Sequence, residues 1–203
     1  MLSERFTQAV DYAREAHASQ TRKGTSIPYI AHLLGVASLV LDYGGDEDQA
    51  IAALLHDTIE DQGGHHEAVI RNQFGGRVVD IVLACTDGTL EGKDVPPGRK
   101  RADWEQRKRR YLAHLAEAPD DALLVSGCDK LHNARAIVAD LRAIGPAVFD
   151  RFTGKRDGTL WYYREITDVF SGRAAPMAGE LRSVVDAMAS DGPGTRGALS
   201  YRS

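Results

Sequence analysis

Cysteine is scarce in this sequence. Cys85 and Cys128 are the only two cysteines among 203 residues, and they form no CxxC pair. Two cysteines this far apart provide no disulfide framework of the kind that stabilises small secreted domains. The sequence therefore predicts a fold held by its hydrophobic core, in a reduced, cytoplasmic setting.

A long apolar run is also missing. No uninterrupted apolar segment approaches the roughly 18 residues that a membrane-spanning helix requires. The N-terminus, MLSERFTQAVDYAREAH, is amphipathic and charged from Ser3 onward. It therefore lacks the apolar region of a signal peptide. We expect no export and no membrane partner.

The chain has no excess of positive charge. It carries 25 Lys and Arg residues against 29 Asp and Glu residues, a net charge of −4. Nucleic-acid-binding proteins generally carry a basic surplus that neutralises phosphates, so no nucleic-acid partner is expected. Any smaller polyanion must meet a local basic patch. Residues 99–112, RKRADWEQRKRRYL, hold seven basic and two acidic residues, but most of this run is typical of a solvated helix face.

Alternating strand patterns are nearly absent, whereas apolar residues recur at helical spacing along most of the chain. This periodicity predicts an all-α fold of about eight or nine helices. We place the helices at about 3–18, 28–43, 46–60, 65–74, 76–86, 102–117, 120–141, 157–171 and 176–189. Residues 1–190 are expected to form a single domain, followed by an aperiodic, flexible tail at 191–203.

One segment, LLHDTIEDQ at residues 54–62, places Asp57, Glu60 and Asp61 beside His56. On a continuous helix, His56 would share a face with Glu60, and Asp57 would share one with Asp61. Like charges at this spacing destabilise a helix, and acids at its C-terminal end oppose the helix dipole. A divalent cation bound by imidazole and carboxylate groups would remove the conflict.

Two other residues provide further metal ligands. His32 lies on an otherwise apolar helix, and Asp129 follows the apolar run LLVSGC. Taken singly, each is more typical of a hydrogen-bonded core histidine or a solvated acid. Together with His56 and Asp57 they form a set of two imidazoles and two carboxylates from three helices, which suits a divalent metal ion if the side chains converge.

The order H, HD, D resembles that of the HD-domain metal-dependent phosphohydrolases. More specifically, RKGTSIPYIAH, AALLHDTIED and DKLHNAR resemble the hydrolase domain of the RelA/SpoT enzymes and the single-domain small alarmone hydrolases. The resemblance implies an HD-domain helical bundle that binds one ion, usually manganese. The implied metal ligands are His32, His56, Asp57 and Asp129. The implied catalytic pair, which places and activates the attacking water, is Glu60 and Asp61.

The resemblance also implies a substrate, guanosine tetra- or pentaphosphate, cleaved at the ribose 3′ side to give pyrophosphate and GDP or GTP. Arg22 and Lys23 match a pair that packs on the nucleobase and reaches phosphate. Lys108 falls where relatives carry a substrate lysine. Asn133, one turn after Asp129, can hydrogen-bond ribose or phosphate. These four residues are our predicted substrate contacts.

Some alternatives stay open. Ala136 stands where many relatives carry a threonine, so the substrate could be another nucleotide, such as a 3′-pyrophosphorylated adenosine nucleotide or the 2′-phosphate of NADPH. A non-catalytic alarmone-binding protein is a further alternative, against which Glu60 and Asp61 argue. Residues 161–163 suit either a base pocket or the core, and the loop at 88–99 suits a lid. The oligomeric state is also undetermined.

Overall fold

The computed structural model describes residues 2–86 and 100–190, with side chains omitted at 100–102. The loop expected at 88–99 and the tail expected at 191–203 lie outside the described residues. The elements in chain order are α1 (Glu4–Ala16), α2 (Ile30–Asp42), α3 (Glu47–Leu55), α4 (Thr58–Gln62), α5 (His66–Phe74), α6 (Gly76–Cys85), α7 (Lys100–Glu117), α8 (Asp120–Ile144), the 3-10 helix η2 (Gly145–Arg151), α9 (Lys155–Gly172) and α10 (Ala178–Ser190).

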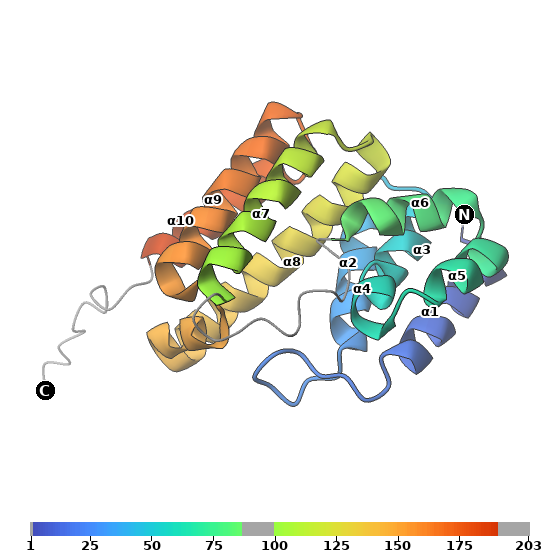
Figure 1. The fold of residues 1–203 in the computed structure, drawn as a ribbon, viewed down its shortest axis with the longest axis horizontal. Helices are drawn as coiled ribbons and strands as arrows, with labels where there is room; N and C mark the ends of the chain where they lie inside the picture. The colour runs from blue at the N-terminus through green and yellow to red at the C-terminus, as the bar shows by residue number, and fades with distance from the viewer. Residues whose placement is uncertain (1, 87–99, 191–203) are drawn as a thin grey trace, which may run out of the picture.

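The all-α prediction is confirmed, because the described residues form helices and no strand beyond one isolated bridge between Thr21 and Pro28. The long helix α8 lies between two groups of helices (Figure 1). On one side α2 and α3 pack on each other and on α8, and on the other α10 packs on α8 and α9. None of the described helices combines the length and the apolar character needed to cross a bilayer.

One hydrophobic cluster includes buried residues from α1 to α10. Leu33 of α2, Leu54 of α3, Leu131 of α8 and Phe170 of α9 are all fully buried in it. Each such side chain contributes about 1.5–3 kcal/mol relative to exposure in water. The core thus joins both helical groups to α8, which also carries one of the predicted metal ligands.

The prediction of a single helix at about 46–60 is wrong. The chain forms α3 and α4 instead, with a break at His56 and Asp57, where Asp57 has φ −95° and ψ −5°. The Asp57 side chain makes no capping hydrogen bond at the start of α4, and its Oδ2 accepts one from the Tyr29 hydroxyl instead. The break therefore directs Asp57 toward α2, a tertiary contact that helical periodicity does not encode.

We expect Gly154→Ala to destabilise the fold. A Cβ at Gly154 would lie 2.6 Å from Cη2 of Trp104, a rigid indole that packs against the start of α9. Such overpacking costs about 1–3 kcal/mol, measured as a lower midpoint of thermal unfolding. The matched control is Gly172→Ala at the other end of α9, where a Cβ meets nothing within 4 Å. Equal midpoints for the two variants would contradict this account of the packing.

Candidate metal centre and adjoining cavity

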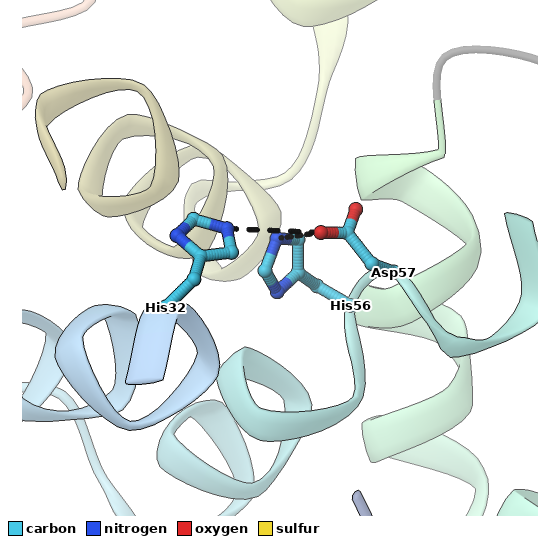
Figure 2. A group of neighbouring side chains, drawn as sticks. All are labelled: His32, His56 and Asp57. Carbon is cyan, nitrogen blue, oxygen red and sulfur yellow. Dashed lines mark ion pairs between the residues drawn. The ribbon is translucent and has the colours of Figure 1, made fainter. Parts of the chain in front are cut away.

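Three of the predicted ligands converge at the break between α3 and α4. His32 projects from α2 toward His56 and Asp57 (Figure 2). Each residue offers one ligand atom, and these atoms all lie within 4.8 Å of one another. Asp57 Oδ2 is 3.0 Å from His56 Nε2 and 3.7 Å from His32 Nε2. Two imidazoles and a carboxylate thus face one point between α2 and the start of α4.

The fourth predicted ligand, Asp129, reaches the same place from α8. Its Oδ1 lies 3.2 Å from His32 Nε2 and 3.6 Å from His56 Nε2. The residue is only 4% exposed, in the middle of a buried stretch of the helix. The structure therefore brings all four side chains together, from α2, from the α3–α4 break and from α8. We refer to His32, His56, Asp57 and Asp129 as the His/Asp cluster.

The hydrogen bonding of the two imidazoles suits a metal ion. His56 Nδ1 lies 2.8 Å from the Ala53 carbonyl oxygen, which can only accept, so Nδ1 carries a proton. His32 Nδ1 contacts the ring of His132 at 2.9 Å. Both Nε2 atoms are buried and have no hydrogen-bond partner of acceptable geometry. A buried polar atom without a partner is costly, whereas a divalent cation takes imidazole nitrogen and carboxylate oxygen together.

The charges in the His/Asp cluster also favour a cation. Burial alone would raise the pKa of Asp57, but the imidazoles of His56 and His32 hold it well below its usual range. Burial would likewise raise the pKa of Asp129, but Lys130 and the same imidazoles hold it well below. Burial would lower the pKa of His56, yet the two carboxylates raise it well above its usual value. Both acids therefore stay ionised and attract positive charge.

Two residues that the sequence did not single out hold these carboxylates. The Tyr29 hydroxyl donates to Asp57 Oδ2 at 2.5 Å, and Lys130 Nζ donates to Asp129 Oδ2. Burial, then Asp57, and to a smaller extent Asp129 and Asp61 raise the pKa of Tyr29, so its hydroxyl stays a donor. A sequence signal existed in both cases, since Tyr29 lies three residues before His32 and Lys130 follows Asp129 directly.

A cavity of about 590 Å³ adjoins the His/Asp cluster. Tyr29 and Lys130 line it while bonding the carboxylates of Asp57 and Asp129, so the cluster and the cavity share a wall. All four predicted substrate contacts line it as well, namely Arg22, Lys23, Lys108 and Asn133. The described lining residues include six cationic side chains and one carboxylate, Asp140. The local basic patch that a polyanion requires is thus present.

The remaining wall is largely aromatic and apolar. Trp104, Phe152, Tyr162 and Tyr163 line the cavity, as does Ala136 on α8. Lys108 Nζ lies 4.8 Å from the centre of the Tyr162 ring. Trp161 is not among the lining residues, and its ring stacks with the Arg109 guanidinium at 4.7 Å. The aromatic segment is therefore divided, with two tyrosines at the cavity and the tryptophan beside it.

Asn133 makes contacts within the protein that the sequence did not suggest. Its Nδ2 donates to Asp129 Oδ1 at 2.6 Å, and its Oδ1 accepts from Arg22 Nη2 at 3.0 Å. It thereby connects the His/Asp cluster to the cationic wall. His132, the next residue back, contacts His32 and does not line the described cavity.

The predicted catalytic pair, Glu60 and Asp61, lies on α4, which begins directly after the predicted ligand Asp57. Both residues are partly buried, and neither is among the described lining residues of the cavity. Asp61 Oδ2 accepts a hydrogen bond from Gln20 Nε2 at 2.7 Å, and the backbone N–H of Asp61 donates to the Asp57 carbonyl. Asp61 is thus fixed one turn beyond Asp57.

The fold and this arrangement define an HD-domain protein. A family model described as HD domain matches residues 9–160, and the chain belongs to that family. The guanosine-3′,5′-bis(diphosphate) 3′-pyrophosphohydrolase MESH1 of Xenopus tropicalis is 39% identical over 131 residues, which are 63% of this chain and 66% of that protein. The guanosine-3′,5′-bis(diphosphate) 3′-pyrophosphohydrolase of Aquifex aeolicus is 34% identical over 136 residues, 66% of this chain.

A solved structure supports the same relationship. It is that of a metazoan ortholog of SpoT, described as hydrolysing ppGpp and acting in starvation responses. It matches with a TM-score of 0.72 and 26% sequence identity, over 92% of this chain and 96% of that chain. The resemblance drawn from the sequence motifs is thereby confirmed. The chain spans 18% of the Aquifex aeolicus protein and 66% of the Xenopus tropicalis protein.

Metal binding should release a proton. In the metal-free protein the carboxylates of Asp57 and Asp129 outweigh the effect of burial and raise the pKa of His56 well above its usual value, which favours the protonated imidazole. A metal ion requires the neutral ring, so binding should displace about one proton, and the affinity should fall as the pH is lowered. Calorimetric titration with manganese in two buffers of different ionisation enthalpy measures the number of protons. Equal heats of binding in both buffers would refute this expectation. The control is His65→Ala, which removes an exposed histidine outside the His/Asp cluster and should release the same number of protons as wild type.

We expect Tyr29→Phe to weaken metal binding by about 10–100-fold, because it removes the hydroxyl that orients the Asp57 ligand. The ring remains, and it stacks on His17 with centroids 5.2 Å apart, so the fold should be retained. Tyr43→Phe is the matched control, since its hydroxyl bonds Glu180 instead. Equal manganese dissociation constants for the two variants would show that the Tyr29 hydrogen bond does not position Asp57.

Proposed function

We propose that this chain hydrolyses the 3′-diphosphate of guanosine tetra- and pentaphosphate, using one divalent ion, manganese, and releasing pyrophosphate with GDP or GTP. The observation that carries the proposal is the shared wall between the His/Asp cluster and a cavity lined mainly by cations. Relatives over most of this length carry the name of that activity. A buried acidic metal site beside a cationic pocket suits a phosphorylated small molecule.

The cavity supplies the groups that a nucleotide requires. Its volume of about 590 Å³ lies within the range of ordinary small-molecule sites. In the proposed complex, Arg22 and Lys23 cover the base and reach phosphate, and Lys108 binds phosphate. An arginine plane stacks on a flat base, while the lysine stem only covers it. Tyr162 and Tyr163 offer the opposite, aromatic wall.

In the proposed reaction a water oxygen attacks the phosphorus attached to O3′, the bond from that phosphorus to O3′ breaks, and O3′ takes up a proton. A divalent ion, when bound, supplies positive charge to the phosphate and lowers the pKa of water toward about 7. Glu60 accepts the proton of the attacking water. Asp61, held by Gln20, orients that water. The anionic products leave as pyrophosphate and a nucleotide with a 3′-hydroxyl.

The proposal predicts pyrophosphate release from guanosine tetraphosphate when the purified chain is supplied with manganese. Asp57→Ala should lose both metal and activity, because it removes a ligand. Glu60→Ala should keep the metal and lose about 10²–10⁴-fold in kcat, the usual contribution of a general base. The control is Glu165→Ala, at an exposed position on α9. No pyrophosphate release, with manganese verified as bound, would overturn the proposed function.

A further inference from the structure

Arg151 lines the cavity from η2 and is held in place on two sides. Its Nη1 donates to Asp140 Oδ2 of α8 at 2.5 Å, and its side chain is 21% exposed. On the other side it lies directly against Gly24, where a Cβ would be 2.8 Å from Arg151 Cδ and Nε. Gly24 has φ +73°, a conformation that glycine adopts readily. Gly24 belongs to the loop between α1 and α2. The backbone of this loop therefore packs against the Arg151 side chain.

The place of Asp140 along α8 shows where the Arg151–Asp140 pair lies relative to the His/Asp cluster. Asp140 lies eleven residues after the metal ligand Asp129, which corresponds to about 16 Å along a helix. Asn133 lies between Asp129 and Asp140 on this helix, and it is hydrogen-bonded to both Asp129 and Arg22. The loop thus runs along α8, with Arg22 near the His/Asp cluster and Gly24 at the distant end. Arg151 and Asp140 mark the end of the cavity away from the predicted metal.

The Arg151–Asp140 pair contributes little to stability, because partly exposed ion pairs are generally worth about 0–1 kcal/mol. The pair instead fixes a guanidinium at the cavity wall. A guanidinium has five donors in a planar fork, and its other edge can form a bidentate contact with a phosphate. Fixing it in advance reduces the entropy lost on binding. Lys23, which precedes Gly24, adds a second positive charge.

We infer that Arg151 is a specificity-determining residue that binds the 5′-diphosphate of the substrate, the group that is not cleaved, at the end of the cavity away from the His/Asp cluster. This inference rests on the proposed function. The ribose carries its 3′ and 5′ substituents on opposite sides, so placing the 3′-diphosphate at the cluster directs the 5′ group away from it. Asp140 orients Arg151 and stays paired with it in the complex.

The test compares two substrates, guanosine tetraphosphate and the analogue that has the 3′-diphosphate and a 5′-hydroxyl. Arg151→Ala should raise KM for the tetraphosphate by about tenfold, the usual effect of losing a hydrogen bond to a charged group. Its kcat should stay within about twofold of wild type, because Arg151 is remote from the bond that breaks. KM for the analogue should not change. Equal changes in KM for both substrates, or none for either, would overturn the inference.

The matched control is Arg109→Ala, which removes the same charge from α7, where the guanidinium stacks on Trp161 and bonds Glu105 without lining the cavity. It should leave both KM values unchanged. Arg151→Lys, which keeps the charge without the fork, should recover part of the loss for the tetraphosphate only. Should Arg151→Ala fail to fold, Arg151→Lys decides the question, and an unchanged KM for the tetraphosphate would then refute the assignment.

Failure of the proposed function can be told apart from failure of this inference. If wild type releases no pyrophosphate, GDP binding to the manganese-loaded protein still tests Arg151. Trp104 lines the cavity, so its fluorescence should change when GDP binds. Binding that is about tenfold weaker in Arg151→Ala than in wild type, with guanosine unaffected, supports a 5′-diphosphate site. GDP binding of equal strength in both proteins, or its absence in wild type, would overturn it.

Discussion

The structure depends on packing two carboxylates, buried Asp129 and partly buried Asp57, against two buried imidazoles at a point where three chain segments meet. An ionised group removed from water is costly unless an opposite charge compensates it. Here His56 and Lys130 provide part of that compensation, and a divalent cation would provide the rest. The break before α4 and the hydrogen bond from the Tyr29 hydroxyl both serve to hold Asp57 in this group of charges. The local fold thus places opposite charges and hydrogen-bond donors around the two carboxylates of the His/Asp cluster.

A second consequence is the separation of charge between surface and cavity. The chain carries a net charge of −4, yet among the described residues that line the cavity six of the seven charged side chains are cationic. Elsewhere, acids pair with arginines, as Asp46 and Asp121 do with Arg77. Because a cavity with low-dielectric walls focuses the field of its lining charges, the overall charge says little about the ligand. The cavity therefore attracts an anionic molecule although the net charge of the chain is negative.

The sequence predicted most of the helices, because their apolar periodicity reflects the same core that the structure buries. It also predicted which His and Asp residues would lie together, since their order and spacing match a known family. It did not predict the break at Asp57 or the contacts of Tyr29, Lys130 and Arg151. Each of these contacts depends on which helices pack together. Arg151 and Asp140, for example, are 11 residues apart on different elements, so helical periodicity gives no indication that they pair. Local pattern therefore predicted which His and Asp residues form the cluster, and tertiary packing determined which side chains hold them.

One face of α8 connects the His/Asp cluster to the cavity. Asp129, Asn133, Ala136 and Asp140 are spaced by four, three and four residues, which places them on a single helical face. Three of them line the cavity, and Asn133 bonds the fourth, Asp129. The same rigid element thus fixes the predicted metal ligand Asp129 at one end and the carboxylate of Asp140, which bonds Arg151, at the other. Because a helix advances about 1.5 Å per residue, the distance between the two ends is set by residue number alone. A substitution on this face, for example at Ala136, changes side-chain chemistry without changing that distance, so under the proposed function the base pocket can vary while the spacing between the His/Asp cluster and Arg151 stays constant.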